Sequence, residues 1–238
     1  MSPDPPPARA PRLEILPDAA AAARRGAEVV AGEARAAVRA RGRFTLALSG
    51  GRTPWAMLAA LAASDVPWAS VQVFQVDERV APAGDPERNL PGIEAALLSP
   101  GPLAPGQIQA MAVEDHDLEA AALRYSALLG AHAGIPPRLD LVHLGLGADG
   151  HTASLFPGDP LLAEEERDVA VTTSPAGRRR LTLTLPVLRR ARRRLWIVTG
   201  AEKAAALARL ARADPGIPAG LAVAAGDWIL ADRAAAER

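Results

Sequence analysis

A glycine-rich segment near the middle of the chain carries the residues best suited to chemistry. It reads Gly145-Leu-Gly-Ala-Asp149-Gly-His151, with three glycines within six residues. Glycines permit unusual backbone angles and leave room for a ligand. A histidine titrates near neutral pH and can take a proton from water, and a nearby carboxylate can orient it and raise its basicity. A lone loop histidine is more often a helix cap, but the glycines and Asp149 favour a general base at His151.

A second glycine-rich segment, Ser49-Gly50-Gly51-Arg-Thr53-Pro54, joins an apolar run to an expected helix. The backbone of such a loop can approach a ligand closely, and the free amides at a helix N-terminus favour an anion. Ser49 and Thr53 add hydroxyl groups, and Thr53 is a natural N-cap. The spacing matches neither the P-loop nor the dinucleotide-binding fingerprint. The segment therefore predicts either an anion-binding loop or an ordinary tight turn.

Charged residues follow other apolar runs of the chain. Asp77-Glu78-Arg79 supplies carboxylates and a guanidinium that could hold a phosphate or carboxylate through two parallel hydrogen bonds. Lys203 lies in the expected first turn of a helix, where the helix dipole disfavours a cation unless an anion is near. Arg180 precedes an alternating Leu-Thr strand. Solvated surface charges are the competing interpretation, and positions at the ends of strands favour a binding site.

The composition excludes several classes of protein. The 238 residues contain no cysteine, which rules out disulfides, thiolate metal sites and a cysteine nucleophile. Lys+Arg and Asp+Glu both number 27, and this balance argues against a nucleic-acid binder. The four histidines show no metal-ligand spacing. We therefore expect no metal, no cofactor and no nucleic-acid partner.

The sequence also bears on domain organisation and location. No segment approaches the roughly 18 consecutive apolar residues of a membrane span. Residues 1–12 hold five prolines and no apolar run of signal-peptide length. We expect a disordered tail over 1–12, a single catalytic domain over 13–238, no membrane partner and a cytoplasmic location.

Alternating strands and helices must position these residues. We expect strands over 44–48, 71–76, 139–144, 169–172, 181–185, 195–198 and 228–230. Helices are expected over 19–40, 54–63, a short stretch up to 98, 117–133 and 201–213. This alternation predicts an α/β fold, with a mostly parallel, Rossmann-like sheet and helices on both faces. Ligands of such sheets bind beyond the carboxyl ends of the strands. Because polar clusters follow Leu48, Val76, Leu144 and Val198, we expect a single active site there.

The chain resembles the 6-phosphogluconolactonase family from about residue 13 to 236. The matching segments are Leu-Ser-Gly-Gly (48–51), Asp-Glu-Arg (77–79), Gly-Leu-Gly-Ala-Asp-Gly-His-Thr-Ala-Ser-Leu-Phe-Pro (145–157), Leu-Thr-Leu-Pro (183–186) and Thr-Gly-x-x-Lys-Ala (199–204). The third segment is highly specific. The resemblance implies hydrolysis of 6-phosphoglucono-1,5-lactone to 6-phosphogluconate in the oxidative pentose phosphate pathway. Because members are often monomers, it also implies a monomer.

The resemblance assigns roles to the site residues by position. His151 would be the general base, with Asp149 and Asp77 lining the same pocket. The phosphate and the sugar-acid oxygens would be held by Ser49, Gly50, Gly51, Arg79, Arg180 and Lys203. The carboxylate that orients His151 stays open between Asp149 and Asp77. The oxyanion donor stays open as well, with Arg79 and loop amides as candidates. The segment 80–85 lacks the family's usual Val-Pro pair.

Two other functions compete with the lactonase. A related family of amino-sugar-6-phosphate isomerases/deaminases shares the Asp-Gly-His loop, the phosphate loop and the lysine. Those enzymes carry a glutamate five residues after the histidine, where this chain has Phe156, and a tyrosine where it has Arg79. Both differences favour the lactonase. A non-catalytic sugar-phosphate-binding protein would need no base, so His151 and Asp149 argue against it.

Overall fold

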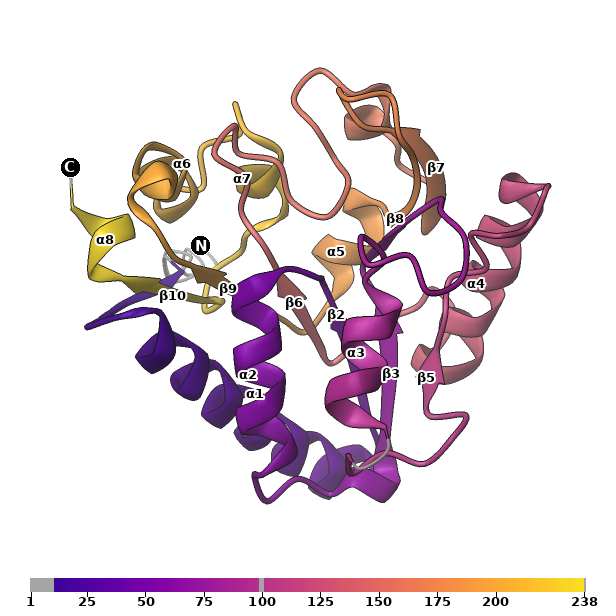
Figure 1. The fold of residues 1–238 in the computed structure, drawn as a ribbon, viewed down its shortest axis with the longest axis horizontal. Coiled ribbons are helices and arrows are strands. Elements are labelled where there is room, and N and C mark those ends of the chain that lie inside the picture. The colour runs from indigo at the N-terminus through magenta and orange to yellow at the C-terminus, as the bar shows by residue number, and fades with distance from the viewer. Residues whose placement is uncertain (1–10, 99–100, 238) are drawn as a thin grey trace, which may run out of the picture.

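Seven parallel strands form the central sheet of the computed structural model, which describes residues 11–98 and 101–237 (Figure 1). Their order is β1-β10-β9-β6-β2-β3-β5, and every neighbouring pair is parallel. The strands are β1 (Arg12–Leu16), β2 (Phe44–Leu48), β3 (Val71–Gln75), β5 (Ile108–Gln109), β6 (Leu141–Leu144), β9 (Arg193–Val198) and β10 (Trp228–Asp232). The predicted α/β fold with a mostly parallel sheet is confirmed.

The helices begin and end at residues that suit those positions. Asp18 accepts a hydrogen bond from the Ala21 amide (2.7 Å) at the start of the first helix, and Gly42 ends it with a left-handed φ of 71°. The α-helices are α1 (Ala19–Arg41), α2 (Arg52–Ala62), α3 (Leu90–Leu97), α4 (Leu118–Ala133), α5 (Leu185–Arg190), α6 (Ala204–Ala211), α7 (Pro218–Ala222) and α8 (Arg233–Ala236). Short 3-10 helices are η1 (Trp68–Ser70), η2 (Pro160–Ala163) and η3 (Ala201–Lys203).

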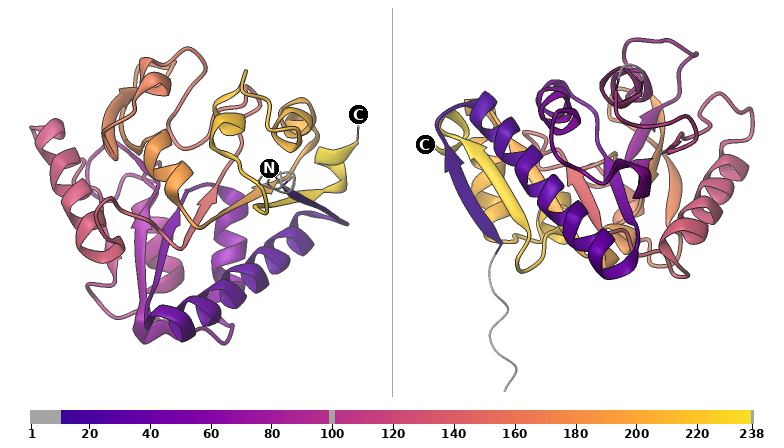
Figure 2. Two further views of the ribbon diagram at one scale, coloured as in Figure 1. Left: turned by 180° about the vertical axis from the view of Figure 1, so that it is seen from behind. Right: turned by 90° about the horizontal axis from the view of Figure 1, so that it is seen from below.

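The sheet is buried on both faces, as its apolar strands require. Successive residues of β9 point to opposite faces: Leu195 and Ile197 pack with α1, α2 and α3, whereas Trp196 and Val198 pack with α4 to α7. Two hydrophobic cores result, one on each face, and Figure 2 shows helices on both sides of the sheet. The predicted helices on both faces are therefore confirmed.

A second, smaller sheet stands apart from the first, and the sequence did not predict it. It is antiparallel, with the order β4-β8-β7, and consists of β4 (Asp77–Arg79), β8 (Arg179–Leu183) and β7 (Val169–Thr173). The residues expected to follow the strand over 71–76 are thus themselves a short strand. In this sheet Arg79 lies directly opposite Arg180.

Several element boundaries differ from the predictions. The helix α2 begins at Arg52 rather than Pro54, with Gly51 as its N-cap, so Thr53 lies inside the helix and is not the cap. The strand β1 begins at Arg12, the last residue of the predicted tail, and residues 1–10 of that tail lie outside the described residues. The helix expected over 201–213 is divided into η3 and α6. No helix among the described residues is both long and apolar enough to cross a membrane.

The strand order creates a switch point beside β2. From β2 the chain continues to β3 and β5 on one side, and then returns to β6 on the other. Loops that leave the carboxyl ends of β2 and β6 therefore diverge, which opens a crevice between them. Ser49 follows β2 and Gly145 follows β6. The two glycine-rich segments of the sequence thus flank this crevice.

Candidate active site

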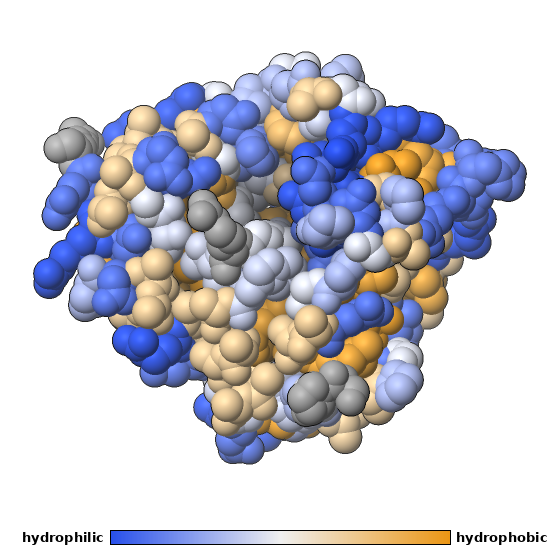
Figure 3. Space-filling model, in the orientation of Figure 1, coloured by the Kyte–Doolittle hydropathy of each residue, from blue (hydrophilic) through white to orange (hydrophobic). Residues whose placement is uncertain are grey.

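A cavity of about 310 Å³ lies at the carboxyl ends of the parallel strands. On the face drawn in Figure 3 the surface is hollowed near its centre, with hydrophilic residues along one side. Eight of the nine predicted site residues line the cavity, namely Ser49, Gly50, Gly51, Asp77, Arg79, His151, Arg180 and Lys203. Asp149 is the exception, because it lies beside His151 and does not line the cavity. Residues from five separate loops and strands thus meet at one place.

His151 is held by Asp149. Its Nδ1 lies 2.6 Å from Asp149 Oδ1, and the same oxygen accepts the His151 amide (3.1 Å). Burial opposes ionisation of Asp149, but hydrogen bonds from the His151 amide and ring outweigh it and lower the pKa of this carboxyl. An ionised Asp149 accepts a hydrogen bond from Nδ1–H, which leaves Nε2 as the basic ring nitrogen.

Gly147 makes room for this pair. A Cβ at this position would lie 2.1 Å from His151 Nδ1 and 2.4 Å from Asp149 Oδ1. The Gly147 amide also donates to the His151 carbonyl (2.8 Å), which closes the loop on itself. The glycine is therefore required by close approach of the His151–Asp149 pair.

Phe156 connects His151 to Arg180. The Phe156 and His151 rings lie 4.8 Å apart between centroids, and the Arg180 guanidinium carbon lies 5.8 Å from the same phenyl ring. Phe156 itself is buried. The imidazole and the guanidinium therefore both contact the same phenyl ring.

The loop after β2 approaches a neighbouring loop very closely. A Cβ at Gly50 would lie 1.7 Å from Asn89 Oδ1, and Gly51 has a φ of 122° that favours glycine. The Ser49 hydroxyl donates to the His143 carbonyl (3.1 Å). Thr53 does not cap the helix, and its hydroxyl is instead hydrogen-bonded to that of Thr199 (2.9 Å). The loop is thus fixed on both sides before any ligand binds.

Asp77 contacts Arg180 and not His151. Its Oδ2 accepts the Ser154 hydroxyl (2.6 Å) and lies 3.7 Å from Arg180 Nη1, while Oδ1 accepts Asn89 Nδ2 (3.3 Å). The carboxylate in contact with His151 is therefore Asp149, whereas the sequence left Asp149 and Asp77 open. Asp77 instead fixes the position of the guanidinium.

Two arginines face the cavity from opposite strands. Arg79 on β4 lies directly across from Arg180 on β8, an arrangement of like charges that is unfavourable without an anion. Burial lowers the pKa of Arg180, Asp77 opposes this effect, and the charge of Arg79 adds to it. Asp77 offsets part of this repulsion, and a bound anion would relieve more of it, so the pair is suited to an anionic group.

Asn89 is a site-forming residue that the sequence did not indicate, and Glu78 was predicted only as one carboxylate of the segment 77–79. Asn89 lines the cavity, accepts Arg79 Nη1 on its side-chain oxygen and donates to the Asp77 carbonyl (2.9 Å). The carboxylate of Glu78 is fully buried and accepts the amides of Arg79, Asn89 and Leu90, each at 2.8 Å. A buried acid after an apolar strand was the available signal for Glu78, whereas nothing local distinguishes Asn89 from a turn residue.

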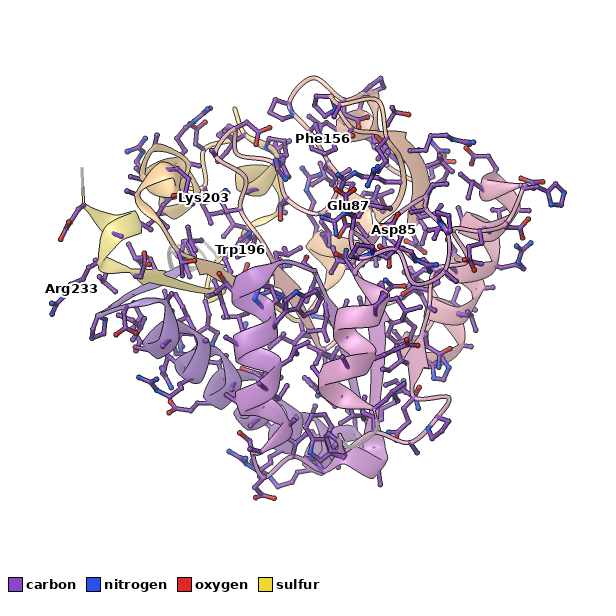
Figure 4. The ribbon with its side chains drawn as sticks, viewed as in Figure 1. Asp85, Glu87, Phe156, Trp196, Lys203 and Arg233 are labelled. Carbon is purple, nitrogen blue, oxygen red and sulfur yellow. The ribbon has the colours of Figure 1, made fainter. Side chains whose placement is uncertain are left out.

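Lys203 approaches the cavity from the other side. It ends η3, immediately before α6, and lines the cavity together with Thr199 and Glu202. Figure 4 shows Lys203 on the α6 side of the molecule, apart from Phe156 and Glu87. The cavity therefore has cations at two places, Lys203 on one side and the two arginines on the other.

The other histidines lie outside the cavity. His143 is buried in β6, His116 is almost fully exposed, and His132 packs edge-on against Phe74. Among the described residues, no group of three or more histidine, aspartate or glutamate side chains is arranged to hold a metal ion. The titratable side chains that line the cavity are those of His151, Arg79, Arg180, Lys203, Asp77 and Glu202.

Comparisons with known proteins point to one family. A sequence model described as glucosamine-6-phosphate isomerases/6-phosphogluconolactonase matches residues 17–230. The chain is 40% identical to the 6-phosphogluconolactonase of Mycobacterium tuberculosis, over 95% of this chain and 97% of that protein. It is 39% identical to that of Streptomyces coelicolor, with 92% and 89% covered. The solved structure of 6-phosphogluconolactonase from Trypanosoma cruzi matches with a TM-score of 0.84 at 26% identity, covering 96% of each chain. The chain therefore belongs to the glucosamine-6-phosphate isomerase/6-phosphogluconolactonase family.

Proposed function

We propose that this chain hydrolyses 6-phosphoglucono-1,5-lactone to 6-phosphogluconate, as a carboxylic ester hydrolase of the oxidative pentose phosphate pathway. The observation that carries the proposal is the His151–Asp149 pair, 2.6 Å apart, in a cavity that also holds Arg79, Arg180 and Lys203. A base that activates water and cations that bind a sugar phosphate are the parts this reaction needs. The names of the relatives from M. tuberculosis and S. coelicolor support the same activity.

The reaction follows from the chemistry of a lactone. Its carbonyl carbon is already electrophilic, so water needs only the removal of a proton as it attacks. His151 takes that proton on Nε2, while Asp149 holds the proton on Nδ1 and stabilises the imidazolium. The ring oxygen then leaves and takes the proton back from the imidazolium. General base catalysis of this kind is typically worth about 10²- to 10⁴-fold in rate.

The remaining cavity residues bind and orient the substrate. Lys203, Ser49, Gly50 and Gly51 line the cavity around the helix α2 N-terminus and η3, and they hold the phosphate and sugar oxygens. Arg79 and Arg180 contribute charge from the opposite side. Binding at a part of the substrate that does not react supplies orientation for the step at the carbonyl.

The alternative of amino-sugar-6-phosphate isomerisation and deamination fits the cavity less well. That chemistry requires an acid to open the sugar ring, and the position five residues after His151 holds Phe156. The phenyl ring packs at 4.8 Å from the imidazole, so an apolar contact occupies the place where the deaminases carry a glutamate.

We extend the proposal to the organisation of the protein. Residues 13–238 act as a single catalytic domain, with Asp77, Asp149 and His151 in its catalytic machinery. The protein works as a cytoplasmic monomer on a small sugar phosphate and needs no cofactor, metal, nucleic acid or membrane.

The proposal is tested by generating 6-phosphogluconolactone in situ and following acid release with purified protein, after subtraction of spontaneous hydrolysis. Glucosamine 6-phosphate serves as the competing substrate, with ammonia release as its readout. Rapid lactone hydrolysis without ammonia release is expected. Lactone hydrolysis no faster than background would overturn the proposal, and ammonia release would establish the deaminase instead.

A further inference from the structure

The geometry points to Arg180 as the residue that stabilises the oxyanion, with the lactone carbonyl on the Arg180 side of the cavity and the phosphate on the Lys203 side. This inference rests on the proposed function and names the hydrogen-bond donor to the oxyanion, which the proposed reaction leaves unassigned. Three observations support it. Arg180 and His151 contact the same phenyl ring, the guanidinium is held in position, and other hydrogen-bond donors around the base already have partners.

Arg180 and His151 are held against the same phenyl ring. Phe156 lies 4.8 Å from the imidazole and 5.8 Å from the guanidinium carbon, measured from the ring centroid. A water molecule activated by His151 attacks a carbon next to the imidazole, so the carbonyl oxygen on that carbon lies within the same region. Lys203 comes from a different element, η3 after β9. Arg180 is therefore a cation that shares a contact residue, Phe156, with the base.

The guanidinium is fixed and partly removed from water. Its Nη1 lies 3.7 Å from Asp77 Oδ2 and 3.4 Å from the Ser154 hydroxyl, and the side chain is only 18% exposed. These contacts are on Nη1, and Arg180 lines the cavity. A preorganised cation in a site of low water content stabilises developing negative charge more strongly than one in bulk water. Arg180 therefore has the placement that an oxyanion site requires.

The competing donors near His151 are already engaged. The Gly147 amide donates to the His151 carbonyl and the Gly150 amide to the Gly147 carbonyl. The His151 amide is bound to Asp149, and the Ser49 hydroxyl is bound to the His143 carbonyl. Arg79 donates its Nη1 to Asn89. Arg79 and Arg180 are thus both engaged through Nη1, and the contact with Phe156 that Arg180 shares with His151 distinguishes the two arginines.

The step balances with these groups alone. The water oxygen forms a bond to the lactone carbon as His151 Nε2 takes a proton, and the carbonyl electron pair moves to the oxygen beside Arg180. When that pair returns, the bond from the carbon to the ring oxygen breaks. The leaving oxygen takes the proton from the imidazolium and becomes a hydroxyl group. The new carboxylic acid ionises and leaves a carboxylate facing the arginine.

The test compares Arg180→Gln with Lys203→Met, using 6-phosphogluconolactone hydrolysis and inhibition by inorganic phosphate. We expect Arg180→Gln to lower kcat by about 10²- to 10³-fold, with little change in KM or in the inhibition constant of phosphate. Lys203→Met is expected to weaken phosphate inhibition and raise KM by about 10-fold or more, with a smaller effect on kcat. Arg180→Lys keeps the charge and loses the planar fork, and we expect intermediate activity.

Controls separate this inference from a fault in folding or in the proposed function. Arg178→Gln alters a neighbouring exposed arginine that is paired with Glu87, and we expect activity close to wild type. Guanidinium ions added to Arg180→Ala are expected to restore part of its kcat, which a misfolded variant would not show.

A kcat of Arg180→Gln equal to that of the wild type would overturn the inference. Weaker phosphate inhibition of that variant would also overturn it, since the phosphate would then lie at Arg180. A wild-type protein without lactonase activity would instead refute the proposed function.

Discussion

The imidazole of His151 is hydrogen-bonded through Nδ1 to Asp149, 2.6 Å away, and this carboxylate does not line the cavity. His151 and Asp149 therefore have different positions relative to the cavity. His151 lines the cavity, whereas Asp149 contacts its Nδ1 from outside the cavity lining. Asp77, the other carboxylate predicted to be catalytic, is bound to Ser154 and lies near Arg180. Asp149 therefore contacts His151, whereas Asp77 lies near Arg180.

Replacing Asp149 with Asn removes the charge that holds the proton on Nδ1. We expect kcat to fall by roughly 10²-fold or more, because the imidazole is no longer held in the basic tautomer. KM should change little, since Asp149 lies outside the cavity. The matched control is Asp115→Asn, which alters the Asp115–His116 pair (3.2 Å) away from the site. If Asp149→Asn and the control were equally active, Asp149 would not be the orienting residue.

Gly147→Ala tests the close packing behind the base. Its Cβ would lie 2.1 Å from His151 Nδ1, so the imidazole or the loop must move. We expect most of the hydrolytic activity to be lost while circular dichroism remains that of the wild type. Gly32→Ala is the control, because a Cβ there meets nothing within 4 Å and Gly32 lies in α1, outside the cavity lining. An active Gly147→Ala variant would show that the loop tolerates a different position of the histidine.

His143 makes stability depend on pH. Burial lowers its pKa to about 4, and neither ring nitrogen has a hydrogen-bond partner among the described residues. The unfolded chain binds this proton below about pH 6.5 and the folded chain only near pH 4, so stability falls as the pH drops through that window. Between pH 7 and pH 5 the loss is about 2 kcal/mol.

The variant His143→Leu should lack this part of the pH dependence. Leu48 and Leu195 are its register partners on the neighbouring strands, so an apolar side chain suits the position. Urea denaturation at pH 7 and pH 5 measures the difference between the variant and the wild type. An equal loss of stability in both proteins would show that His143 is not responsible.

Much of the fold could be predicted because its central strands are short apolar runs. The strand over 44–48 was predicted with its observed bounds, and the helix α1 was predicted to within one residue because Gly42 ends it. The edge strand β1 was missed because Leu13 and Ile15 alternate with charged residues and remain exposed. The separate antiparallel sheet was missed as well, because periodicity identifies a strand but not its partner.

The contacts in the site also differ in how far apart their residues lie in the sequence. His151 and Asp149 are two residues apart, so their contact could be expected from the sequence. Asn89 is distant from Gly50 in the chain, and its role depends on a close approach that only the folded structure creates. Likewise, the cross-strand position of Arg79 and Arg180 follows from the register of β4 with β8. Contacts between distant loops are therefore the part of the site that required the structure.

The central claim is that His151 activates water for hydrolysis of the lactone. The most direct measurement follows acid release from 6-phosphogluconolactone, generated in situ, for the wild type, His151→Ala and His116→Ala. The last variant changes a histidine that is also paired with an aspartate but lies outside the cavity. We expect rapid hydrolysis by the wild type and by His116→Ala, and near-background hydrolysis by a folded His151→Ala. Full activity of His151→Ala would contradict this claim, and the base would then have to be sought elsewhere, starting with Asp77.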